Sequence, residues 1–146
     1  MKVNLFISKD IEEAHTDIHT DKLTENISKA INILEDNDRK DMITVKKDSD
    51  LIFLELNDIF MFRVEDKKVI VYSENKEYSI KKPLYQVEED LNSDFVRISK
   101  TTIINLKKIE RVAPSLKGLM FIELKNGLKD NISRKYLPEF KNALDI

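Results

Sequence analysis

Short alternations of apolar and polar residues run through most of this chain, and a period of two predicts β-strands. From residue 42 onward such runs follow one another: MITVKKD, DLIFLELNDIFMFRVED, KKVIVYSEN, KEYSIKK, FVRIS, TIINLKKIERVAP, GLMFIELKNG and LKDNIS. The long second run must bend or pair on both sides of Asn57 and Asp58. The chain's two glycines, Gly118 and Gly127, fall at expected hairpin turns. The C-terminal two thirds of the chain are therefore expected to be mostly β.

Three segments repeat apolar residues at helical spacing instead. Residues 25–36 (ENISKAINILED) place Ile27, Ile31 and Leu34 on one face, with Thr24 as a helix N-cap. Residues 82–92 contain Pro83, which suits the first position of a helix. A short C-terminal helix is expected in RKYLPEFKNAL.

The N-terminal segment differs in plan from the rest of the chain. KVNLFIS (2–8) and AHTDIHT (14–20) alternate as strands do, and the helix after them completes a β-β-α segment. DNDRKD (36–41) has no apolar periodicity and is expected to be a linker. We therefore expect residues 1–40 to serve in docking or dimerisation and residues 41–146 to form a separate domain. The predicted class is mainly β, or α+β overall.

Composition narrows the possible location and chemistry. With 146 residues and 41% hydrophobic content, the chain can bury a core. It contains no long apolar run, and its N-terminus turns charged too early for a secretory signal, so we expect a cytoplasmic protein without a membrane span. Zero cysteines exclude disulfides, thiolate zinc sites and cysteine nucleophiles.

Charge is distributed unevenly along the chain. Residues 1–40 carry 6 basic and 9 acidic side chains, residues 41–94 carry 8 and 13, and residues 95–146 carry 11 and 5. A basic C-terminal third suggests a face that binds a polyanion, although solvated lysines produce the same count. Charge alone leaves both interpretations open.

No catalytic or metal-binding pattern is recognisable. Two glycines are too few for a phosphate-binding loop or a nucleophile elbow. His15 and His19 are expected on a strand, where residues four apart lie too far from each other to share a metal ion. The acidic run Glu88 to Asp90 is expected to be the solvated side of a helix. We expect neither enzymatic activity nor a cofactor.

Basic residues near strand ends and turns are the remaining candidates for a function. They include Lys67 and Lys68, Arg97 and Lys100, Lys117, and Arg134 and Lys135. Irregular backbone near residues 100–102 would turn Lys100 and the hydroxyls of Thr101 and Thr102 outward. Such groups suit hydrogen bonds to phosphates and base edges.

The segment FVRISKTTIINLKKIERV (95–112) resembles the signature of LytTR-type DNA-binding domains. The positions that fit the signature are Phe95, Arg97, Lys100, Thr101, Ile103, Ile104, Asn105, Ile109 and Val112. LNDIFMFRVEDKKVIVYSENKEY is similar to the opening strands of the family, and MFIELKNGLKDNISRKYLPEFKNAL is similar to its closing segment. Ser99 departs from the pattern, because the family commonly has histidine there.

The resemblance implies an elongated β-sandwich of about ten strands with short helices, whose loops enter the major groove of duplex DNA. Matched to the family's loops, the reading positions are Lys67, Lys100 and Arg134. The full set of expected DNA contacts is Lys67, Lys68, Arg97, Ser99, Lys100, Thr101, Lys117, Arg134 and Lys135. Arg97 and Asn105 are also candidates for internal hydrogen bonds.

The favoured hypothesis is a stand-alone bacterial transcription regulator that binds promoter DNA sequence-specifically, at single sites or paired repeats. A homodimer is compatible with it. The N-terminal 40 residues are too short for a phosphoacceptor receiver domain. The alternative is a protein-interaction or anti-regulator module that keeps the fold without DNA binding, which Ser99 and the net charge of −2 both permit.

Overall fold

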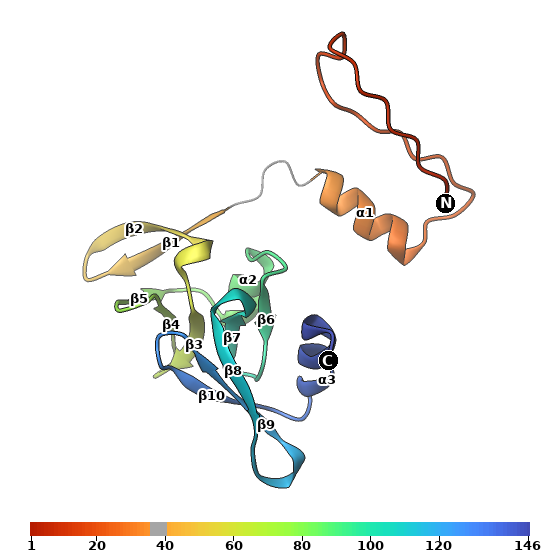
Figure 1. Ribbon diagram of the computed structural model, residues 1–146. Helices are drawn as coiled ribbons and strands as arrows, with labels where there is room; N and C mark the ends of the chain where they lie inside the picture. The colour runs from red at the N-terminus through yellow and green to blue at the C-terminus, as the bar shows by residue number, and fades with distance from the viewer. Residues whose placement is uncertain (36–40) are drawn as a thin grey trace. The chain divides into compact units, whose positions relative to one another are not determined.

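The structure is a computed structural model that describes residues 1–35 and 41–146 (Figure 1). The chain divides into two compact units, Met1–Asp38 and Arg39–Ile146. The expected linker, except for Asp41, lies outside the described residues.

The N-terminal unit contains helix α1 (Glu25–Glu35), as predicted. Thr24 caps it, because its Oγ1 accepts a hydrogen bond from the Ile27 backbone N–H at 3.3 Å. The prediction of strands at 2–8 and 14–20 was wrong, because residues 1–24 form no strand in the structure. A two-stranded hairpin is marginal in water unless one face packs on something, and Val3, Leu5 and Ile7 are more than 80% exposed here.

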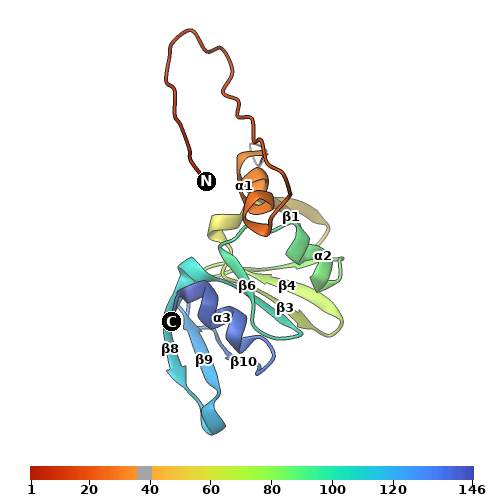
Figure 2. The same ribbon diagram turned by 90° about the vertical axis from the view of Figure 1, so that its right-hand side faces the viewer.

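The second unit contains ten strands in two antiparallel sheets, which confirms the predicted fold class (Figures 1 and 2). The larger sheet has seven strands in the order β2-β1-β5-β4-β3-β7-β6. Their bounds are β1 (Met42–Lys47), β2 (Asp50–Glu55), β3 (Met61–Glu65), β4 (Lys68–Tyr72), β5 (Glu77–Ile80), β6 (Phe95–Arg97) and β7 (Thr102–Asn105). The smaller sheet has the order β10-β9-β8, with β8 (Ile109–Pro114), β9 (Met120–Leu124) and β10 (Lys129–Ile132).

Short helices connect or cover these strands. The predicted bend at Asn57 and Asp58 is the 3₁₀ helix η2 (Leu56–Asp58). Helix η3 (Leu106–Lys108) connects β7 to β8, and η4 (Leu116–Gly118) connects β8 to β9. Helix α2 (Leu84–Glu89) is shorter than predicted, and Pro83 is its N-cap rather than its first helical residue. Helix α3 (Leu137–Leu144) ends the fold beside β6 (Figure 1).

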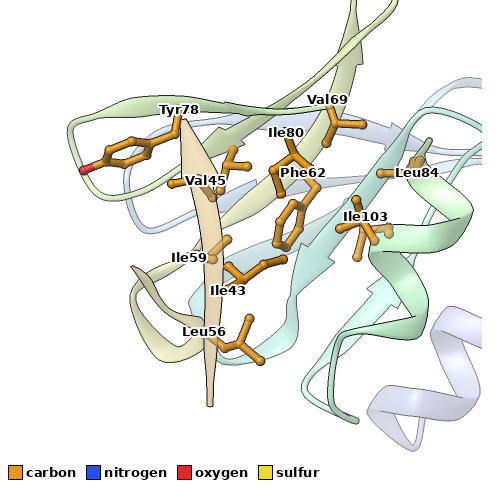
Figure 3. Packing of buried hydrophobic residues seen from close by; sticks show 12 residues of the cluster. Ile43, Val45, Leu56, Ile59, Phe62, Val69, Tyr78, Ile80, Leu84 and Ile103 are labelled. Atoms are coloured by element: carbon orange, nitrogen blue, oxygen red, sulfur yellow. The ribbon is translucent and has the colours of Figure 1, made fainter. Parts of the chain in front are cut away.

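The central strands of the large sheet are buried on both faces. Phe62 and Ile103 pack with Val45, Leu84 and other residues in one cluster, which places α2 on that face (Figure 3). Their neighbours Met61 and Ile104 point the other way, into a second cluster that includes Ile122, Leu124, Ile132 and Phe140 from the smaller sheet and α3. A strand buried on both faces needs consecutive apolar residues, which explains why Ile103 and Ile104 break the alternation.

Candidate nucleic-acid interface

Three connections of the large sheet open at the same end. The β3–β4 turn follows the pair Glu65 and Lys68, and β5 ends beside β4 with Ile80 opposite Val69. The β6–β7 loop joins them because the Val64 N–H donates to the carbonyl oxygen of Thr101 at 2.8 Å. Residues far apart in the sequence thereby come together.

A groove of about 620 Å³ lies between these connections and carries six basic side chains. Its apolar floor includes Val64, Val69 and Leu84. The basic residues that line it are Lys67, Lys68, Lys81, Lys82, Arg97 and Lys100. Four of these were expected from the sequence, and Lys81 and Lys82 were not.

Among the described residues that line the groove, six are basic and none is acidic. Arg97 pairs with Glu88 at 2.9 Å and Lys82 with Asp90 at 3.2 Å, and both acids belong to the α2 region. Within the described parts of the chain, no carboxylate forms an ion pair with the remaining four lysines of the groove, which are all exposed. A concave surface of one charge sign raises the local concentration of a polyanion.

Lys67 projects from a tight turn with unusual backbone angles. Asp66 and Lys67 both have positive φ, 48° and 65°. A two-residue hairpin loop of type I′ requires positive φ at both of its central residues. Neither residue is glycine, so each left-handed residue stores about 1 kcal/mol or more of backbone strain. The turn holds Lys67 exposed at the rim of the groove.

Arg97 is the most constrained cation of the site, and its side chain is only 15% exposed. Its Nε donates to the carbonyl oxygen of Ser99 at 2.8 Å, and its Nη2 donates to the carbonyl oxygen of Lys100 at 2.5 Å. Its Nη1 binds Glu88. The guanidinium group therefore clamps the backbone of the β6–β7 loop.

The hydroxyl groups of the same loop bind each other. The oxygens of Ser99 and Thr101 lie 3.2 Å apart, and Ser99 Oγ accepts a hydrogen bond from the Thr101 N–H. This local turn leaves the side chain of Lys100, between them, exposed.

The segment after β10 lies next to this loop. The Ser133 N–H donates to the carbonyl oxygen of Ile98 at 2.9 Å, and Arg134 and Lys135 follow, both exposed. The ring of Tyr136 links the two segments, with Arg97 Cζ 6.0 Å and Lys135 Nζ 5.6 Å from its centroid. These distances lie within the range of cation–π attraction.

Lys117 is separated from these residues. It lies in η4 between β8 and β9 of the smaller sheet, with φ 59°, and does not line the groove. Figures 1 and 2 both show this hairpin extending away from the β3–β4 end of the large sheet. Its position depends on the smaller sheet, whose placement the sequence pattern did not predict.

A polar network supports the loop from behind. Thr102 Oγ1 donates to Asp130 Oδ2 at 2.7 Å, and Arg63 Nη1 lies 3.8 Å from the same carboxylate oxygen. Burial and the hydrogen bond to Glu65 raise the pKa of Tyr72 above its ordinary value. Burial lowers the pKa of Arg63, but the Tyr72 hydroxyl and the nearby acids outweigh it, so its pKa is raised.

Asn105 is buried and internally satisfied. Its Nδ2 donates to the carbonyl oxygen of Ile59 at 2.9 Å, and its Oδ1 accepts from the Lys107 N–H at 3.0 Å. This agrees with the structural role considered from the sequence.

Sequence reasoning missed Lys81, Lys82, Glu88 and Tyr136. Lys81 and Lys82 directly follow β5, and the hairpin register that sets Ile80 opposite Val69 would have placed them near Lys68. Glu88 was interpreted only as a solvated residue, yet it is a partner of Arg97. Tyr136 carried no signal, because its contact with Arg97 depends on tertiary packing.

Residues 1–35 and 41–146 include no helix that is long and apolar enough to cross a membrane. In the same residues, no three His, Cys, Asp or Glu side chains gather as a metal site. His15 and His19 are exposed on irregular backbone, not on the strand that was expected.

The second unit is thus a β domain of ten antiparallel strands with a basic groove at one end of its larger sheet. Residues 49–145 match the model of the LytTr DNA-binding domain family, and the chain belongs to that family. The match confirms the resemblance inferred from the sequence.

Relatives extend over the whole chain. A Staphylococcus aureus (strain COL) protein described as an uncharacterized HTH-type transcriptional regulator is 33% identical over 146 residues, which is 100% of this chain and 99% of the relative. A protein of the same description from a bovine strain is 32% identical over the same shares of both chains. In the described part of the present chain, β6 to β10 separate α2 from α3, so these two helices do not form a helix-turn-helix.

A solved structure has the same fold. The LytTr DNA-binding domain of a response regulator from Bacillus cereus superposes with a TM-score of 0.69. It is 23% identical in sequence, and the match covers 73% of this chain and 99% of that one.

Proposed function

We propose that this protein is a cytoplasmic transcription regulator that binds duplex DNA sequence-specifically. The observation that carries the proposal is the convergence of six basic side chains from three connections at one end of the large sheet. Membership of a DNA-binding family and whole-length relatives described as transcriptional regulators support it. No enzymatic step is assigned to the chain.

In this proposal the β6–β7 loop and the segment after β10 enter the major groove. Arg134 has a planar fork that matches the O6 and N7 acceptors of guanine, whereas Lys100 and Lys67 are flexible point charges that suit phosphates or single acceptors. The exposed side chains of Lys68, Lys81 and Lys135 add phosphate contacts around them.

Local charge outweighs net charge in this proposal. The whole chain carries −2, but six cations line the groove, and only two of them, Arg97 and Lys82, form ion pairs with acids of the described chain. Because exposed charges are screened beyond about 8–10 Å at physiological salt, DNA at the groove would be affected mainly by the nearby lysines.

The proposal is tested by fluorescence anisotropy with labelled duplexes. Random duplex and promoter fragments selected by the protein from genomic DNA are titrated at several salt concentrations. We expect log K to fall linearly with log salt, with a slope of about −0.9 for each phosphate neutralised, and a selected site that binds more tightly than random duplex. Salt-independent or undetectable binding would favour the interaction-module alternative.

A further inference from the structure

Glu88 is an acidic residue beside the basic groove. It is an exposed residue in the last turn of α2. Its carboxylate oxygen lies 2.9 Å from Nη1 of Arg97, a residue that lines the groove. By charge alone, a carboxylate in this position should repel a phosphate backbone and weaken DNA binding. Its contacts indicate a different role.

The contacts of Glu88 lead through Arg97 to the β6–β7 loop. The Glu88 carboxylate accepts a hydrogen bond from Arg97 Nη1. Nε and Nη2 of the same guanidinium group donate to the carbonyl oxygens of Ser99 and Lys100. Arg97 is 15% exposed, and Glu88 is 48% exposed, so the acid fixes a cation that is largely shielded from solvent. Charge-assisted hydrogen bonds on three sides leave the guanidinium few other orientations.

We propose that Glu88 is a positioning residue for sequence recognition, which acts through Arg97 to hold Lys100 in its reading geometry. This inference rests on the proposed function and adds a residue of opposite charge to it. Arg97 then supports the loop rather than contacting a phosphate. Its stacking near Tyr136 extends the same support to the segment that carries Arg134.

The physical reason concerns the difference between phosphate and base contacts. Phosphate contacts tolerate small displacements, whereas hydrogen bonds to base edges need the loop in one geometry. A loop that is ordered before binding avoids the entropic cost of becoming ordered in the complex. Glu88 should therefore favour the specific site while slightly opposing binding to any duplex.

Substituting Glu88 and its neighbour separates these two effects. Glu88→Gln and Glu89→Gln remove the same charge from the same helix, and Glu89 is exposed with no ion pair to any described residue. Electrostatics alone predicts that both variants bind random duplex slightly more tightly. Positioning predicts that Glu88→Gln, unlike Glu89→Gln, lowers the ratio of specific to random binding by about three- to tenfold, as loss of a partly exposed charged pair would.

Two further measurements distinguish positioning from direct contact. Arg97→Lys keeps the positive charge but loses the fork, so we expect a lower specificity ratio with an unchanged salt slope, whereas loss of a phosphate contact in Arg97→Gln would reduce the slope by about 0.9. In the free protein, amide hydrogen exchange at Ser99–Thr101 should be faster in Glu88→Gln than in Glu89→Gln.

The outcomes are separable. If the wild type prefers a specific site and both glutamine variants change that preference equally, Glu88 has no positioning role. If Arg97→Gln lowers the salt slope by about 0.9, Arg97 contacts a phosphate and the inference also fails. If the wild type shows no salt-sensitive binding to any duplex, the proposed function itself is wrong, and this inference falls with it.

Discussion

Thr102 on β7 donates a 2.7 Å hydrogen bond to Asp130 on β10, and this contact joins the two sheets two residues after Lys100. Thr102 is fully buried, so the expectation that its hydroxyl faces outward was wrong, and this hydroxyl is satisfied by the carboxylate of Asp130 instead of by water. The position of the recognition loop is therefore tied to the packing of the smaller sheet.

Thr102→Val should destabilise the fold by about 1–2 kcal/mol, because it leaves a half-buried carboxylate without one of its donors. Urea denaturation followed by circular dichroism measures the change. Thr44→Val, at an exposed position on β1, is the matched control and should have little effect. Equal midpoints for the two variants would mean that Asp130 finds another partner.

Tyr72 should ionise at higher pH than an ordinary tyrosine, because burial and its hydrogen bond to Glu65 raise its pKa. Absorbance at the phenolate band during alkaline titration should include a late-titrating component, and Tyr72→Phe should remove it. Because the folded state holds this proton more tightly than the unfolded state, its contribution to stability is present below about pH 10 and is lost as pH rises through the folded pKa. A variant that loses phenolate absorbance at the ordinary pH of tyrosine ionisation, and keeps the late component, would contradict this.

A fragment that begins at Asp41 should unfold cooperatively on its own. Both hydrophobic clusters of the second unit consist of residues between Ile43 and Leu144, with no contribution from α1. Thermal unfolding of the fragment and the full chain should give similar sharp transitions. A broad, non-cooperative transition would show that the N-terminal unit completes the core.

The N-terminal unit should mediate self-association. Leu34 is 51% exposed and Ile33 is 66% exposed on α1, a helix too short to be stable without a packing partner. Sedimentation equilibrium should detect a dimer of the full chain, weakened by Ile31→Asp and absent in the fragment from Asp41. A monomeric full chain at tens of micromolar would rule this out.

Arg134→Ala should cost about 1–3 kcal/mol on the specific site and much less on random duplex, because an arginine that reads a base acts only at its preferred sequence. Lys67→Ala should weaken both alike and reduce the salt slope by about 1. Lys125→Ala, in the β9–β10 turn beside a different hollow, is the control. Binding that is indifferent to Lys100 and Arg134 substitutions would show that recognition occurs elsewhere.

Local pattern was enough for most of the second unit. Alternation, turn residues and helix caps depend on nearby residues, so most of the strands, the bend near Asn57 and the turns at Gly118 and Gly127 were predictable. The run TIINLKKIERVAP was predicted as one strand, but it is two, β7 and β8, which belong to different sheets. The family signature added the two-sheet fold. The ends of α2 were predicted less exactly than its position. Terminal residues of a helix, such as Pro83 and those after Glu89, differ little in free energy between helical and non-helical backbone.

Only the tertiary structure decided which partners these elements have. The alternation at 2–8 and 14–20 was real, but Val3, Leu5 and Ile7 are exposed, so burial of apolar side chains does not stabilise strands there. Lys81 and Lys82 line the groove because β5 pairs with β4. Lys117 lies outside the groove because it belongs to η4, between two strands of the smaller sheet. Arg97 carries the same charge as Lys100 in the sequence. Its burial against Glu88 and two carbonyl oxygens makes it a support rather than an exposed cation, because long-range packing determines which charges remain free to meet a ligand.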